Sequence, residues 1–181
     1  MKIIQTDFHG DTNIGLFAKA SDKFCLVGNF LMDKTLHQMK NVLGVDVRKI
    51  TIANTDLIGI FCVMNSNGLL LPRIANRREL SFFVKLKKEF GMNVTIVPSK
   101  FTAIGNLIAA NDKGALISRV FSRINRKKIE DILKVKVDIG TANFGSPFLG
   151  SCIVANSNGA VVGDQTTGPE VVRISETLDL L

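Results

Sequence analysis

A short glycine-containing pattern recurs four times along this chain of 181 residues. The aligned glycines stand at positions 15, 59, 105 and 150, so their spacings are 44, 46 and 45 residues. After the last three glycines, an asparagine follows at the sixth position and a second glycine at the ninth. The first repeat has Ser21-Asp22-Lys23-Phe24 in place of this Asn-x-x-Gly pattern. A period of this length predicts an array of similar supersecondary units.

Each repeat is predicted to form a β-hairpin, then a helix, then a further strand. Asn and Gly tolerate the left-handed conformation of a tight turn, so Asn-x-x-Gly between two apolar runs indicates a hairpin. Apolar residues at helical spacing predict helices over residues 33–43, 78–90, 125–133 and from 168 to the C-terminus. Apolar runs after the first three helices predict strands over residues 45–52, 92–97 and 135–139.

The last predicted helix has no strand after it, whereas the chain begins with an unassigned apolar segment, Lys2-Ile3-Ile4-Gln5. The simplest arrangement makes this segment the missing strand of the last repeat, so that the chain closes into a ring without exposed sheet edges. We therefore expect one α/β domain over residues 1–181, a closed ring of about four modules. The expected modules cover approximately residues 6–52, 53–97, 98–139, and 140–181 together with 1–5.

Composition argues against membrane, disulfide and metal chemistry. The longest apolar stretches run about eight residues, far short of the roughly 18 that a membrane span needs, and the polar N-terminus does not resemble a signal peptide. The three cysteines have no CxxC spacing, and neither histidine lies in a metal-spaced cluster. We expect a cytoplasmic protein with buried, reduced cysteines, no metal and no cofactor.

Positive charge is concentrated in the middle of the chain. Residues 73–136 hold 15 Lys and Arg against five Asp and Glu, whereas the rest of the chain holds eight against 11. A basic middle favours an acidic partner such as RNA, although solvated helix faces explain it equally well. The absence of Trp and Tyr disfavours base stacking. Electrostatic contact with structured rRNA stays open, through Arg119, Arg123, Arg126, Lys127 and Lys128.

Several stretches resemble one family closely. These are Thr102-Ala103-Ile104-Gly105-Asn106-Leu107-Ile108 with the Asn-x-x-Gly that follows it, and the C-terminal segments around residues 140–143, 152–163 and 166–170. They are similar to the archaeal and eukaryotic translation initiation factor six family, the ribosome anti-association factors. The resemblance covers essentially the whole chain and implies a pentein, a closed ring of five modules.

The chain departs from that family in one respect. Its first three modules resemble the first three of the family, and the stretch from Gly140 onward resembles the fifth, so one module is missing. Three arrangements remain open: a smaller closed ring, an open ring, or neighbouring chains that complete each other.

The resemblance also implies a function without catalysis. The family binds the joining face of the large ribosomal subunit, through a ribosomal protein near the sarcin–ricin loop, and sterically blocks the small subunit in initiation, recycling or large-subunit maturation. The implied partners are that subunit and its rRNA, with no membrane and no small-molecule substrate. The alternative from another class is a basic RNA- or ribonucleoprotein-binding structural module.

A third alternative is a degenerate enzyme, because other penteins modify guanidino groups with a Cys nucleophile and a His. Cys62 and Cys152 are predicted to lie within strands, and His9 lies beside a turn from which it could reach the ring axis. No phosphate-binding glycine loop is present. We therefore expect no enzymatic activity and no catalytic residues.

On a ring, the turns at the repeated glycines come to the same end of the molecule. The residues beside them are therefore our candidate ribosome-binding surface: Asn13, Gly15, Leu16, Ile60, Asn106 and Ser151. The competing interpretation is that these glycines only allow tight packing near the axis.

Overall fold

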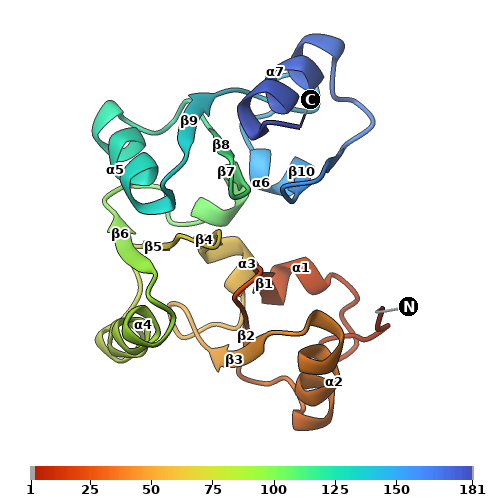
Figure 1. Ribbon diagram of the computed structural model, residues 1–181, viewed down its shortest axis with the longest axis vertical. Helices are drawn as coiled ribbons and strands as arrows, with labels where there is room; N and C mark the ends of the chain where they lie inside the picture. The colour runs from red at the N-terminus through yellow and green to blue at the C-terminus, as the bar shows by residue number, and fades with distance from the viewer. Residues whose placement is uncertain (1–2, 181) are drawn as a thin grey trace.

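A computed structural model describes residues 3–180 and contains four repeating units arranged around a common axis (Figure 1). Unit 1 consists of α1 (Ile14–Phe17), β1 (Ala18–Ala20), β2 (Phe24–Gly28), α2 (Asp33–Leu43) and β3 (Asp46–Ile50). Unit 2 consists of α3 (Ile58–Phe61), β4 (Val63–Met64), β5 (Gly68–Pro72), α4 (Arg77–Phe90) and β6 (Asn93–Val97).

The remaining two units follow the same order of elements. Unit 3 consists of the 3₁₀ turn η1 (Ile104–Asn106), β7 (Ile108–Ala110), β8 (Gly114–Ile117), α5 (Arg123–Leu133) and β9 (Lys136–Ile139). Unit 4 consists of α6 (Leu149–Cys152), β10 (Ile153–Ala155), β11 (Ala160–Val162) and α7 (Gly168–Leu178). No helix in residues 3–180 is long and apolar enough to cross a membrane.

The first three units each contain a small mixed sheet. In unit 2, for example, β5 pairs antiparallel with β4 and parallel with β6, with α4 as the crossover between the parallel strands. Leu70 lies opposite both Val63 and Thr95 in this sheet. The sheets of units 1 and 3 have the same strand order. The predicted α/β architecture of hairpin, helix and parallel strand is therefore present.

The strand that the sequence predicted at the N-terminus is absent from the described residues. Ile3–Gln5 has no strand conformation, and β10 and β11 form a sheet of two strands in the described chain; Lys2 lies outside the described residues. The physical reason is that units 4 and 1 do not come into the contact that the other neighbours make. A Cβ built on Gly15 or on Gly159 meets no atom within 4 Å. The ring is open between β10–β11 and α2, on the right of Figure 1.

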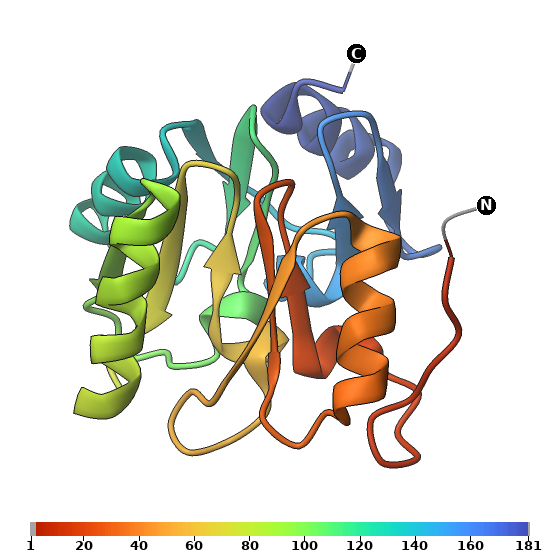
Figure 2. The ribbon, with the colours of Figure 1, turned by 60° about the horizontal axis from the view of Figure 1, so that its bottom comes forward.

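The hydrophobic core lies mostly between neighbouring units. Leu26 of unit 1 belongs to one cluster with Phe83 and Leu86 of α4. In the same way, Leu70 packs with Leu133 of α5, and the sheet of unit 3 packs with α7. Each of these helices is thus shared by the sheet of its own unit and that of the preceding one. Figure 2 shows α2 (orange) and α4 (light green) on the outside of the strands.

Helix ends match their local sequence. Asn76 and Glu79 form a capping box at the start of α4, which ends at Gly91 with φ of 62°. Thr167 and Glu170 form the same box at the start of α7, where Pro169 occupies the first turn. Both glutamates also accept hydrogen bonds from the turn that precedes their own unit, so each cap fixes a loop as well as a helix.

Candidate functional site

Short helical turns place the repeated glycines next to one another. The glycines lie in α1, α3, η1 and α6, and each turn is preceded by a residue with φ near −80° and ψ near 60°. The sequence predicted only turns and strands here, and it placed Cys62 and Cys152 within strands. In the structure Cys152 ends α6 and Cys62 caps α3.

The backbones at three of these glycines are in very close contact. A Cβ built on Gly59 would lie 1.8 Å from the carbonyl oxygen of Gly15. The corresponding distances are 2.1 Å from Gly105 to the Gly59 oxygen and 1.8 Å from Gly150 to the Gly105 oxygen. Real side chains do not tolerate such distances, so Gly59, Gly105 and Gly150 allow tight packing. By contrast, a Cβ built on Gly15 itself would meet no atom within 4 Å, and Gly15 is exposed.

This packing surrounds a cavity of about 530 Å³ on the axis of the molecule. All four units contribute residues to its wall, and all six predicted ribosome-binding residues are among them: Asn13, Gly15, Leu16, Ile60, Asn106 and Ser151. The structure therefore brings the six together, although they span 139 positions of the chain.

The polar groups of the cavity wall differ in their availability. The Asn13 amide nitrogen donates to Asp11 Oδ1 at 2.9 Å, so it is already engaged. The half-buried Asn106 side chain makes no hydrogen bond to any described residue, and Ser151 is exposed. An amide offers two donors and one acceptor, which suits recognition of a partner's backbone.

Among residues 3–180, the wall holds one charged residue, Lys19, and no carboxylate, histidine or cysteine. Cys25 and Cys62 are buried, and burial raises the pKa of each thiol to about 12, which opposes formation of a nucleophilic thiolate. His9 does not reach the axis; it packs edge-on against Phe30 and lies 3.1 Å from the Phe30 carbonyl oxygen. In the described chain, no three His, Cys, Asp or Glu residues are grouped to hold a metal.

None of the predicted rRNA contacts lines the axial cavity; four of them lie on α5 and Arg119 precedes it in the chain. Arg123, Lys127 and Lys128 surround a shallow depression of about 440 Å³ together with Ile124, which is 76% exposed. Arg119 is exposed nearby in the sequence.

Two of these basic groups have partners within the chain. Arg126 donates to the Val137 carbonyl oxygen and lies 3.9 Å from Asp138. Lys127 pairs with Asp131 at 3.0 Å, and the hydrogen bond to that carboxylate raises the Lys127 pKa. Arg123 and Lys128 are therefore better placed than Arg126 to meet a phosphate.

Sequence reasoning missed three residues, one in the cavity wall and two exposed aromatic residues that precede α6. Lys19 lines it directly. Phe148 is 53% exposed two positions before Gly150, where Leu57 and Ala103 stand in units 2 and 3. Phe144 is 83% exposed in the preceding turn, with φ of 59°. The glycine alignment itself could have identified Phe148, because its position is the one that Asn13 occupies in unit 1.

Comparison with known proteins gives one consistent family. The model of the eIF-6 family matches residues 3–139 and again residues 126–177. Proteins called translation initiation factor 6 are 36% identical in Thermococcus gammatolerans and in Pyrococcus abyssi, each over 227 residues covering 100% of both chains. The Methanococcus maripaludis protein of that name is 35% identical over 226 residues, covering 99% of both chains.

The alignment lengths agree with the repeat period. The T. gammatolerans alignment runs over 227 positions and this chain has 181 residues, so 46 positions have no residue of this chain, about the length of one repeat. Residues 126–139 are matched twice by the family model, as expected if the missing repeat lies next to them.

Among solved structures, a Campylobacter jejuni ("C. Jejuni") agmatine deiminase aligns with a TM-score of 0.41 and 11% identity, over 66% of this chain and 46% of that one. This likeness is too low to carry an argument. The sequence matches, by contrast, span the repeats on which the site is built, and this chain belongs to the eIF-6 family.

Proposed function

We propose that this chain is a ribosome anti-association factor. In this proposal it binds the joining face of the large ribosomal subunit through the surface around the axial cavity, and it blocks the small subunit sterically. Membership of the eIF-6 family and the shared name of its relatives support a role in translation initiation. The protein would act in the cytoplasm, without catalysis, on a pentein-like ring that has lost one module.

The observation that carries the proposal is the gathering of the six predicted residues from four units around one cavity. The wall combines apolar side chains such as Leu16 and Ile60 with the half-buried amide of Asn106, which bonds to no described residue. It holds no acid–base pair, so recognition suits it better than a reaction. Mixed chemistry at one repeated position favours a surface shaped for a macromolecular partner.

The test is co-sedimentation in sucrose gradients. A factor of this kind should travel with free large subunits and be absent from joined ribosomes, and it should reduce the joined fraction when it is added to separated subunits. Asn106→Ala should keep the melting temperature and weaken large-subunit binding by about 1 to 3 kcal/mol. Asn158→Ala is the matched control, because Asn158 is an exposed asparagine outside the cavity wall.

Two results would count against the proposal. Unchanged affinity of the Asn106→Ala variant would assign this asparagine a structural role only. Sedimentation with joined ribosomes would favour the alternative, a basic structural module of a ribonucleoprotein.

Replacements on the basic surface of α5 test the alternative, a basic structural module of a ribonucleoprotein, separately. Replacing Arg123, Lys127 and Lys128 by Ala should flatten the salt dependence of binding by about one unit of slope for each lost phosphate contact. If these replacements abolish binding while Asn106→Ala has no effect, the α5 surface, and not the cavity, is the primary contact.

A further inference from the structure

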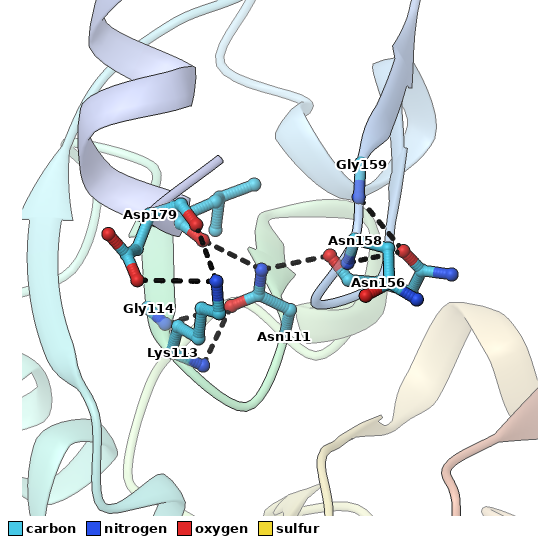
Figure 3. A network of polar contacts seen from close by, with 8 residues as sticks. Asn111, Lys113, Gly114, Asn156, Asn158, Gly159 and Asp179 are labelled. Atoms are coloured by element: carbon cyan, nitrogen blue, oxygen red, sulfur yellow. Dashed lines mark hydrogen bonds and ion pairs between the residues drawn. The ribbon is translucent and has the colours of Figure 1, made fainter. Parts of the chain in front are cut away.

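Neighbouring units meet through a repeated set of contacts, shown for units 3 and 4 in Figure 3. The Asn111 side-chain nitrogen donates to the carbonyl oxygens of Asn156 at 3.0 Å and of Leu178, at the end of α7, at 2.9 Å. A Cβ built on Gly114 would lie 1.7 Å from the Thr177 carbonyl oxygen. The asparagine therefore recognises the last turn of the helix in the next unit, and the glycine lets that turn approach.

Units 2 and 3 meet in the same way. The Asn65 side-chain nitrogen donates to the carbonyl oxygen of Asn111 at 3.1 Å. It also donates to the carbonyl oxygen of Leu133, at the end of α5, at 2.9 Å. A Cβ on Gly68 would lie 2.2 Å from the Ile132 carbonyl oxygen. Beside these polar contacts, paired side chains on one sheet face pack against the helix, and in unit 2 this pair is fully buried.

In the described chain, unit 4 carries the same groups with no helix packed on them. Its corresponding apolar pair is Val154 opposite Val161, and these side chains are 75% and 73% exposed; Val154 also lies at the wall of the axial cavity. The Asn156 oxygen caps its own turn, but its side-chain nitrogen donates to no described residue. Gly159 has open space where Gly68 and Gly114 meet a helix. This face of unit 4 is therefore one half of an interface. On units 1 to 3 the equivalent face is covered by the helix of the next unit.

The covered faces show what fits here. Each of them receives an amphipathic helix, and on units 2 and 3 the last turn of that helix points a carbonyl oxygen at the turn asparagine. The helix α2 is of this type, and Leu43 at its end is 43% exposed. However, the cavity wall already includes residues of both units 1 and 4 of one chain. Leu43 and Gly44 at the end of α2 also line a cavity of about 500 Å³ together with Asn156, so unit 1 of the same chain stands beside this face without covering the two valines. The alignment with the T. gammatolerans relative leaves 46 positions without a residue of this chain, about the length of one repeat, and each repeat of this chain carries one long helix.

We propose that the open face of unit 4, formed by Val154, Asn156, Gly159 and Val161, is a docking site for an amphipathic helix of a partner protein. The two valines bury the apolar stripe of that helix. The Asn156 amide donates to its C-terminal carbonyl oxygens, and Gly159 permits the close approach of its last turn.

The probe is a peptide of this chain that already occupies an equivalent face. Residues 122–135 contain α5, the helix seated on unit 2, whose Val63 and Leu70 correspond to Val154 and Val161. A lactam between Lys127 and Asp131 would hold the isolated peptide helical, because these exposed side chains form an i,i+4 pair. Fluorescence anisotropy of the labelled peptide measures its binding to the full chain.

We expect saturable binding, weakened at least tenfold by Val161→Lys and about threefold by Asn156→Ala. Val172→Lys is the matched control: Val172 is 54% exposed on α7, away from the proposed face, and its replacement should change the affinity less than twofold. A peptide with Leu133→Lys should not bind. Thermal melts verify that each protein variant is folded.

Three results would overturn the proposal. The first is the absence of saturable binding by the folded wild-type chain. The second is an equal loss of binding in the Val172→Lys and Val161→Lys variants. The third is a dimeric mass in light scattering that Val161→Lys converts to a monomer, which would make a second copy the occupant.

Discussion

The hairpins β7–β8 and β10–β11 have nearly the same sequence pattern and opposite environments. In the first, Ala109 lies opposite Leu116, and the two are 5% and 0% exposed. In the second, Val154 lies opposite Val161, with 75% and 73% exposure. The difference is that α7 covers the first pair and no helix of the described chain covers the second. Burial in this molecule is therefore decided by the neighbouring unit as much as by a segment's own sequence.

Glycine substitutions should show the largest contrast between the two hairpins. Gly114→Ala places a methyl group against the Thr177 backbone and should destabilise the protein by about 3 kcal/mol or more. Gly159→Ala should cost less than about 1 kcal/mol, since that position is open. Urea unfolding of the two variants measures the contrast. Equal losses would mean that the open side closes in solution.

Truncating the apolar pairs should give the next largest contrast. Leu116→Ala removes a fully buried side chain between units 3 and 4 and should cost about 3 kcal/mol. Val161→Ala should stay within about 0.5 kcal/mol of the wild type, as exposed substitutions do. Thermal and urea unfolding check both values, and a loss above 2 kcal/mol for Val161→Ala would show that this face is covered.

The turn asparagines separate the cost of a turn from that of an interface. Asn111→Ala loses both the turn hydrogen bonds and the two bonds to unit 4, and should cost about 2 kcal/mol. Asn156→Ala loses the turn bonds alone and should cost about half as much. Equal free energies of unfolding for the two variants would assign the whole effect to the turn.

The smallest expected contrast is in how the stability of the folded state depends on pH in the acid range. Burial raises the pKa of Glu170, but hydrogen bonds from the Thr167 and Gly145 backbones and the Thr141 and Thr167 hydroxyls outweigh it and lower the pKa to about 2. Since the ordinary value is 4.5, this carboxylate stabilises the folded state fully above about pH 4.5, and that contribution is lost as the pH falls towards 2.

Glu170→Gln should therefore lower stability at pH 7 and flatten its decline in acid, as measured by urea midpoints at pH 7, 4 and 2.5. The control is unit 3, where the uncharged Asn125 holds the equivalent position, so Asn125→Ala should leave the acid dependence unchanged. A Glu170→Gln variant that retained the full acid dependence would place the titrating group elsewhere.

Much of the local structure follows from residue patterns. The predicted helix at residues 33–43 coincides with α2, and that at 78–90 begins one residue after α4. The hairpins follow from Asn-x-x-Gly, because an asparagine oxygen accepts the two backbone N–H groups of its own turn, as at Asn65. The six candidate contacts also line one cavity, as the repeat predicted. The repeat period places equivalent residues at equivalent positions in each unit, whether the ring is closed or open.

Other features could not be predicted from the residues alone. The helical turns at the glycines are four residues or fewer, too short for a periodic signal. The segment Ile3–Gln5 is apolar enough to be a strand, but a strand needs a partner edge, and β11 does not receive it here. Arg126 has the same charge as Arg123, yet a contact with Val137 engages it.

By itself, the sequence determined the repeat, the order of elements within each unit, the family and the residues that gather at the axis. These depend on period, turn chemistry and local hydrogen bonds, all of which act over a few residues. Only the tertiary structure decided where the ring is open and which of two similar hairpins keeps an exposed apolar face. The reason is geometric. Backbone contacts at Gly59, Gly105 and Gly150 set the rotation from one unit to the next, and whether these three steps bring unit 4 back against unit 1 depends on their sum and on no single segment.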